Sequence, residues 1–239
     1  MNAVLTAIES SALVPVYSAA DLSTAEAVLR ACYRGGIRVF EFTDRAAGSL
    51  EVFRGLRVLV DSELPGLHLG VGTITTAARA AEFVEAGAEF LVSPVAAEEA
   101  AAWSHGAGVP FIPAGLTPTE LLRAQELGAQ VVKLFPAASV GPNYLKQLRG
   151  PLPQLRCMVT GGVAATPASV QEWLAAGAVA VGLGSDLLPK GPVSPEQAAE
   201  LERRCRELTE AVAAVATVAE AAAVTEASTG AASRQGDPA

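Results

Sequence analysis

A glycine at the junction between a helix-like and a strand-like segment recurs along this chain and restricts the folds open to it. Gly87, Gly128 and Gly177 each stand between small apolar residues, in the tripeptides Ala-Gly-Ala, Leu-Gly-Ala and Ala-Gly-Ala. Each glycine is followed by a short hydrophobic run. Because glycine readily ends a helix, and because the runs are too short for helices, the pattern predicts helices that alternate with buried strands. Such alternation is typical of a parallel sheet.

Eight hydrophobic runs are predicted to be strands, and helical segments separate them. The runs cover residues 12–17, 37–43, 67–71, 89–92, 109–112, 131–135, 156–159 and 178–181. Capping boxes at Ser23 with Glu26 and at Thr117 with Glu120 mark the start of two of the helices. Eight such units within about 200 residues favour a closed (β/α)₈ TIM barrel over the alternative, a doubly wound open sheet.

The chain is expected to form a single domain. We predict that the barrel covers residues 1–217, including a short helix at 2–9 and a closing helix that begins near Ser194. Beyond that boundary the chain loses its hydrophobic periodicity, so residues 218–239 are predicted to be a disordered tail.

Composition and charge argue against several classes of function. The net charge of −8 and the pI near 4.9 disfavour binding to nucleic acids or anionic membranes, which require basic surfaces. No run reaches about eighteen apolar residues, so no transmembrane helix is expected. The first ten residues include Glu9 and no basic segment, which argues against a secretion signal. The spacing of Cys32, Cys157 and Cys205 fits a reducing compartment, and a cytoplasmic location is predicted.

One lysine lies inside a hydrophobic run. Lys133, one of only three lysines, follows Val131 and Val132 and precedes Leu134 and Phe135. Burial disfavours the ammonium form and lowers the pKa of a lysine, which leaves a neutral amine able to attack a carbonyl and form a Schiff base. The alternative is a structural lysine that reaches solvent at a strand end or pairs with a carboxylate.

Further candidates follow the predicted strand 37–43. In a barrel, side chains at the carboxyl ends of the strands surround the active-site mouth. Because side chains alternate along a strand, Glu41, Thr43 and Arg45 share one face. If that face is the interior, Glu41 serves as an acid or base beside Lys133, and Arg45 holds a substrate carboxylate. The alternative is a buried ion pair between Glu41 and Arg45.

Glycine-rich segments end three other strands, the first of which is the predicted strand 67–71. Gly70 and Gly72 would let the backbone approach a ligand, and Thr73 adds a hydroxyl group at the rim. The segment lacks the third glycine and the acid of a dinucleotide site, and it could equally be an ordinary turn.

The last two strands are followed by Thr160-Gly161-Gly162 and by Gly184-Ser185. Barrel enzymes commonly bind a phosphate at these two places through backbone NH groups. The alternative is that the glycines serve only as turns. Since His68 and His105 stand alone in the sequence, neither a metal site nor a Ser/His/Asp triad is predicted.

Four segments together give the chain a family resemblance. They are Gly-Ala-Gln-Val-Val-Lys-Leu-Phe-Pro-Ala-Ala-Ser-Val-Gly at 128–141, Gly-Ile-Arg-Val-Phe-Glu-Phe-Thr-Asp-Arg at 36–45, Ile-Pro at 112–113 with Thr-Pro-Thr-Glu at 117–120, and Thr-Gly-Gly at 160–162. Over about residues 12–188 the chain resembles the 2-keto-3-deoxy-6-phosphogluconate and 4-hydroxy-2-oxoglutarate aldolase family.

The resemblance implies a homotrimeric class I aldolase that cleaves a phosphorylated 2-keto-3-deoxy sugar acid to pyruvate and glyceraldehyde 3-phosphate. It also implies that Lys133 forms the Schiff base and that Glu41 relays protons. No metal and no other cofactor are expected. The residues implied to contact the substrate are Arg45 and Thr73 at its carboxylate, Pro94 and Phe135 at the walls of the pocket, and Gly161, Gly162, Gly184 and Ser185 at its phosphate.

A few positions depart from the pattern of the family. Asp44 and Ala46 flank Arg45 where an uncharged residue and a threonine are usual, and a second acid there could weaken carboxylate binding. Ala114 and Val159 also differ from the residues usual at their positions. We expect these changes to affect substrate choice more than imine chemistry.

Other functions remain open. 4-Hydroxy-2-oxoglutarate or 2-keto-3-deoxy-6-phosphogalactonate are alternative substrates. A trimeric barrel that binds a phosphosugar without turnover, and a phosphosugar isomerase or epimerase that needs no imine, are alternative functions.

Overall fold

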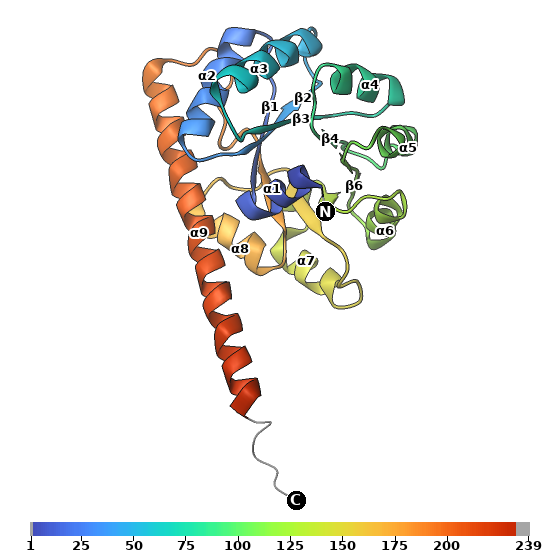
Figure 1. Ribbon diagram of the computed structural model, residues 1–239, viewed down its shortest axis with the longest axis vertical. Coiled ribbons are helices and arrows are strands. Elements are labelled where there is room, and N and C mark those ends of the chain that lie inside the picture. Colours follow the sequence, from blue (N-terminus) through green and yellow to red (C-terminus); the bar gives the residue numbers. More distant parts are fainter. Residues whose placement is uncertain (1, 233–239) are drawn as a thin grey trace, which may run out of the picture.

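The computed structural model describes the backbone of residues 2–232 and the side chains of residues 2–215, which form a ring of strands surrounded by helices (Figure 1). Within this part of the chain the ring contains nine parallel strands: β1 (Leu13–Tyr17), β2 (Val39–Thr43), β3 (His68–Gly72), β4 (Leu91–Val92), β5 (Phe111–Ile112), β6 (Ala114–Gly115), β7 (Val132–Leu134), β8 (Cys157–Thr160) and β9 (Ala180–Leu183). All eight predicted strands are present.

The sheet closes on itself at Pro113. The strand order is β5-β4-β3-β2-β1-β9-β8-β7-β6, so β5 and β6 lie at the two ends of the sheet. Only Pro113 separates them along the chain, and they are therefore two halves of one strand. A proline cannot donate to a strand ladder, which explains the interruption. The nearly closed ring of eight strands confirms the predicted (β/α)₈ barrel.

Helices alternate with the strands along the chain, and most of them cover the outside of the ring. They are α1 (Ala3–Ser11), α2 (Leu22–Arg34), α3 (Ser49–Glu63), α4 (Ala77–Glu85), α5 (Glu98–Ala107), α6 (Pro118–Glu126), the short 3₁₀ helix η1 (Ala137–Ser139), α7 (Gly141–Arg149), α8 (Pro167–Ala175) and α9 (Pro195–Ala232). The predicted capping box of Thr117 and Glu120 is present at α6. The one predicted at Ser23 is wrong, because Asp21 caps α2 and accepts a hydrogen bond from the NH group of Thr24.

Helix α1 closes the amino end of the barrel and lies across the middle of the ring in Figure 1. Its buried side chains Val4, Leu5 and Ile8 pack against side chains inside the ring. Those interior residues are Val14, Val39, Phe90, Val92, Ile112, Val131, Met158 and Ala180. The amino half of the interior is thus apolar and filled, which leaves the carboxyl end for chemistry.

Helix α9 packs against α2 and α8 on the outside of the barrel (Figure 1). A Cβ atom at Gly35 would lie 2.4 Å from the Cβ of Cys205, so the glycine allows α2 and α9 to approach closely. The backbone of α9 continues past residue 217 to Ala232, whereas residues 233–239 lie outside the described part of the chain. The disorder predicted for 218–239 stays a prediction. Within the described residues no helix has the length and apolar character needed to cross a membrane.

Candidate active site

Lys133 and Glu41 meet inside the barrel from opposite sides of the ring. Lys133 lies on β7 and Glu41 on β2, and these two strands face each other in the strand order. The side chain of Lys133 is 4% exposed and that of Glu41 is fully buried. The lysine Nζ lies 3.8 Å from Oε1 of the glutamate, which makes this a buried ion pair. Strand alternation placed Glu41 on one face with Thr43 and Arg45 and left open whether that face is the interior; the structure shows that Glu41 faces inward, next to the lysine.

The carboxyl group of Glu41 is buried without a hydrogen-bond partner among the described residues, and its pKa is raised. Neither of its oxygens has a hydrogen-bond partner among the described residues. Burial raises the pKa of Glu41, and the positive charges of Lys133 and Arg45 offset this only in part. A carboxyl group with a raised pKa gives up its proton less readily, and such a group can both accept and return a proton as a general acid–base catalyst must.

Gly72 makes room for this carboxylate. A Cβ atom at Gly72 would lie 1.8 Å from Oε1 of Glu41, and one at Gly70 would lie 2.4 Å from the ring of Phe90. The sequence analysis interpreted both glycines as points where the backbone approaches a ligand. The structure shows that Gly72 leaves space for Glu41 of β2, and that Gly70 leaves space for Phe90, which immediately precedes β4.

The aromatic ring of Phe135 lies beside the lysine. The ring centroid of Phe135 lies 5.3 Å from Nζ of Lys133. Pro94 and Phe135 together line a hollow of about 340 Å³ that extends toward the start of α6. Gly161 packs on the same ring, since a Cβ there would lie 2.9 Å from it. Pro94 and Phe135 thus line the same hollow, and Phe135 also lies next to Lys133, which does not itself line that hollow.

Thr160 is a further polar group in the interior. Its hydroxyl group is buried and has no hydrogen-bond partner among the described residues. A Cβ atom at Gly182 would lie 2.2 Å from that hydroxyl oxygen, so this glycine makes room for it. The sequence analysis named Thr160 only as part of a glycine-rich loop, because its burial depends on the pairing of β8 with β9.

Arg45 and Thr73 are neighbours at the exposed rim. Nε of Arg45 donates a hydrogen bond to Oγ1 of Thr73 at 3.2 Å. Thr73 has a φ of 68°, a left-handed conformation that is uncommon for a β-branched residue and is often found at ligand sites. The alternative of a buried pair between Glu41 and Arg45 is not what the structure shows, because Glu41 pairs with Lys133 and Arg45 is exposed.

Asp44 pairs with Arg79 of α4. Its carboxylate accepts hydrogen bonds from Nε of Arg79 at 2.8 Å and from Nη2 at 2.7 Å. Burial acts to raise the pKa of Asp44, but the hydrogen bonds from Arg79 and Ser49 outweigh burial and hold the pKa below its ordinary value. Arg79 thus offsets the charge of Asp44, and the expectation that this acid weakens carboxylate binding at Arg45 stays a prediction.

The two predicted phosphate loops lie next to each other at the carboxyl end of the barrel. Gly161 and Gly162 have φ values of 98° and 72°, which only glycine adopts readily. The NH groups of Gly161, Gly162 and Ser185 have no hydrogen-bond acceptor among the described residues. The loops are joined by Asp186, whose Oδ2 accepts a hydrogen bond of 2.6 Å from the NH group of Ala165. Such NH groups can bind an anion.

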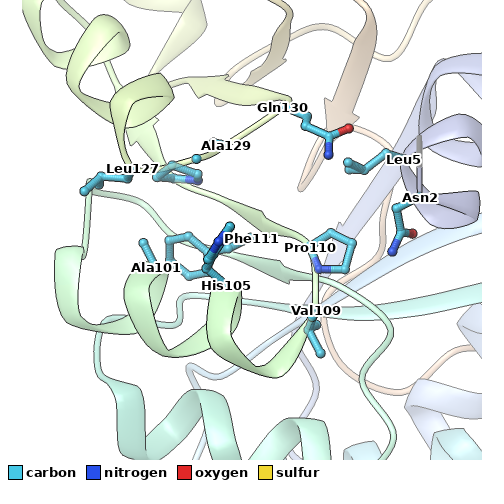
Figure 2. A pocket seen from close by; sticks show the side chains of 13 residues that line it. Asn2, Leu5, Ala101, His105, Val109, Pro110, Phe111, Leu127, Ala129 and Gln130 are labelled. Atoms are coloured by element: carbon cyan, nitrogen blue, oxygen red, sulfur yellow. The ribbon is translucent and has the colours of Figure 1, made fainter.

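A separate hollow of about 230 Å³ lies at the other end of the barrel (Figure 2). It is bordered by Asn2 and Leu5 of α1 and by residues that precede β5 and β7, including Pro110 and Gln130. None of the predicted site residues lines it. Within the described residues, no group of three or more His, Cys, Asp or Glu side chains could hold a metal ion.

Comparisons with known proteins agree on one family. Residues 4–204 match the family model described as KDPG and KHG aldolase. A 2-dehydro-3-deoxy-phosphogluconate aldolase of Pseudoalteromonas atlantica is 34% identical over 182 residues, which are 76% of this chain and 82% of the relative. A KHG/KDPG aldolase of Escherichia coli is 31% identical over 199 residues, which are 83% of this chain and 91% of the relative.

A solved structure is also similar. The 2-keto-3-deoxy-6-phosphogluconate aldolase of Zymomonas mobilis ZM4, crystallised with 3-phosphoglycerate, superposes with a TM-score of 0.76 at 26% sequence identity. The match covers 87% of this chain and 97% of that chain.

Proposed function

Since this chain belongs to the KDPG and KHG aldolase family, it is an aldolase, and aldolases are lyases. We propose that it cleaves 2-keto-3-deoxy-6-phosphogluconate through a Schiff base on Lys133. The products are pyruvate and glyceraldehyde 3-phosphate. The observation that carries this proposal is the buried pair of Lys133 and Glu41, 3.8 Å apart, inside the barrel.

The reaction begins at the lysine amine. Nζ of Lys133 first gives a proton to the carboxylate of Glu41, and the free amine then attacks the keto carbon C2 of the substrate and forms a carbinolamine. Loss of the former keto oxygen as water gives an imine, and Glu41 supplies the proton that this oxygen needs to leave. The protonated imine then withdraws electrons from the bond between C3 and C4.

During cleavage and release, Glu41 first accepts a proton and then returns it. The carboxylate accepts the proton of the C4 hydroxyl group, the C3–C4 bond breaks, and its electron pair moves toward the imine nitrogen. This step releases the aldehyde and leaves an enamine of pyruvate. The carboxylic acid then returns a proton to C3, and water hydrolyses the pyruvyl imine to pyruvate and free Lys133. No metal takes part in this sequence of steps.

The ends of the substrate are held at the rim. We propose that Arg45 and Thr73 bind the carboxylate, because their side chains already contact each other beside Glu41. Pro94 and Phe135 border the carbon chain. The backbone NH groups of the loops that contain Gly161, Gly162, Gly184 and Ser185 bind the phosphate. The 3-phosphoglycerate in the Zymomonas mobilis structure supports a phosphorylated ligand.

The substrate is tested with a panel of acids. Pyruvate release is measured for 2-keto-3-deoxy-6-phosphogluconate, its galactonate epimer and 4-hydroxy-2-oxoglutarate. We expect the highest kcat/KM with the first, and a higher value for either of the others would assign that acid as the substrate instead. Phosphosugar binding without any pyruvate release would favour a non-catalytic barrel. The relative named KHG/KDPG aldolase supports the inclusion of 4-hydroxy-2-oxoglutarate in the panel.

The role of Lys133 is tested by substitution. We expect Lys133→Met to abolish cleavage, because methionine keeps the length of the side chain but has no amine. A variant that kept full activity would favour an enzyme without an imine, such as a phosphosugar isomerase or epimerase.

Assembly and location complete the proposal. We propose a homotrimer on the basis of the family resemblance, and a location in the cytoplasm on the basis of the cysteine spacing. Light scattering after size-exclusion chromatography measures the assembly, and a monomeric mass would contradict the trimer.

A further inference from the structure

Arg204 of α9 connects the two glycine-rich loops although it lies far from both in the sequence. Its Nη2 donates a hydrogen bond of 2.9 Å to the backbone oxygen of Asp186, and a longer one of 3.4 Å to that of Ala165. Its Nη1 lies 3.5 Å from the backbone oxygen of Leu187. Ala165 belongs to the loop after β8, whereas Asp186 and Leu187 belong to the loop after β9. One half-buried guanidinium group therefore contacts both loops.

The same two loops are joined a second time by Asp186, which accepts a hydrogen bond from the NH group of Ala165. The two links are reciprocal, because Arg204 bonds to backbone oxygens of both loops and Asp186 bonds to the backbone NH of the other loop. The turn after Gly184 is tight as well, since the NH groups of Leu187 and Leu188 both donate to its backbone oxygen. The spacing of the loops is thus fixed from the side of α9.

We propose that Arg204 is a positioning residue for phosphate recognition, which sets the distance between the two loops and so lets their NH groups bind one phosphate together. This inference rests on the proposed function. A site made of backbone NH groups cannot adjust by turning a side chain, so its affinity depends on where the loops are held. A planar guanidinium with a fixed fork of donors suits this task better than an ammonium group does.

Arg203 provides a matched control on the same helix. It is exposed and, among the residues whose side chains are described, pairs with Glu200 and Glu207 alone, one turn away on either side of it along α9. Arg203→Met removes the same atoms as Arg204→Met at the neighbouring position, but it breaks no contact to the loops.

The test compares two substrates that differ only in the phosphate: 2-keto-3-deoxy-6-phosphogluconate and the same acid without it. In Arg204→Met we expect KM for the phosphorylated acid to rise about tenfold, a change typical of losing a hydrogen bond from a charged group. We expect KM and kcat for the acid without phosphate to stay within about twofold of the wild type, because the imine chemistry does not involve these loops. In Arg203→Met neither substrate is affected.

Arg204→Lys separates position from charge. Lysine keeps the positive charge near the phosphate but lacks the guanidinium group whose donors reach both loops. We therefore expect KM for the phosphorylated acid to be several-fold higher in Arg204→Lys than in the wild type. This variant also tests the proposal if Arg204→Met does not fold.

Three results would overturn the inference: equal effects of Arg204→Met on both substrates, no effect on either, or wild-type behaviour of Arg204→Lys. A wild-type protein that cleaves neither acid would refute the proposed function, which is a different outcome.

Discussion

Gly72→Ala is a small substitution that should displace the carboxylate of Glu41 from Lys133. The new Cβ would lie 1.8 Å from Oε1, 2.6 Å from Cδ and 3.0 Å from Cγ of Glu41. Side-chain carbons do not approach other heavy atoms closer than 3.0 Å, so Oε1 has to move by at least about 1.2 Å. The substitution changes no charged or polar group, and its effect on catalysis acts only through the position of the glutamate.

The size of the effect follows from this displacement. A misplacement of about 1 Å at a reacting group can cost about 100-fold in rate, and loss of a general acid–base catalyst costs about 100- to 10,000-fold. We therefore predict that kcat falls at least about 100-fold in Gly72→Ala. Overpacking of the interior should destabilise the protein by about 1–3 kcal/mol.

Gly70→Ala is the matched control for this prediction. Gly70 lies two residues earlier on β3, and a Cβ there would lie 2.4 Å from the ring of Phe90 instead of contacting Glu41. It should cost similar stability but leave kcat within about fivefold of the wild type. The assay is pyruvate release by both variants, with thermal melting to confirm that they are folded. Equal losses of kcat in the two variants, or full activity of Gly72→Ala, would refute the reasoning.

Three further predictions concern stability and reactivity. Asp44→Asn loses the ion pair with Arg79 and should lower the free energy of unfolding measured in urea. Because folding lowers the pKa of Asp44, the difference between the wild type and the variant should be largest at pH 7 and vanish as the pH falls to about 2. A difference that does not depend on pH would contradict this. Thr117→Ala removes the cap of α6 and should cost about 1 kcal/mol in thermal unfolding; an unchanged Tm would argue against the cap. Burial raises the pKa of the Cys157 thiol to about 12, so an aromatic disulfide reagent at pH 8 should label it only after unfolding, and rapid labelling of the native protein would contradict that burial.

The strands could be predicted because each is a short hydrophobic run bounded by glycine or proline. Strand β6 was missed, because Ala114 and Gly115 are small residues directly after a proline and show no hydrophobic periodicity. Their place in the sheet comes from pairing with Lys133 and Leu134 of β7. That pairing is a tertiary contact, and local sequence patterns do not contain it.

Part of the candidate site could be predicted from the sequence, because strand alternation puts Glu41 on one face with Thr43 and Arg45, but alternation does not say which face is the interior. The site was not predictable where the partner comes from another element. Gly72 gives space to Glu41 only because β2 and β3 pair in a particular register. Asp44 finds Arg79 on α4, and Arg204 reaches the loops from α9. These contacts depend on the packing of elements that are distant in sequence.

The central claim is that the amine of Lys133 inside the barrel forms the imine. Reductive trapping with pyruvate tests this claim most directly. The protein is incubated with pyruvate and borohydride, digested, and examined by mass spectrometry of its peptides. Lys146 and Lys190 are both exposed and serve as internal controls within the same sample. We predict a reduced pyruvyl group on Lys133 alone, and an unmodified Lys133, or modification only at the two exposed lysines, would contradict the account.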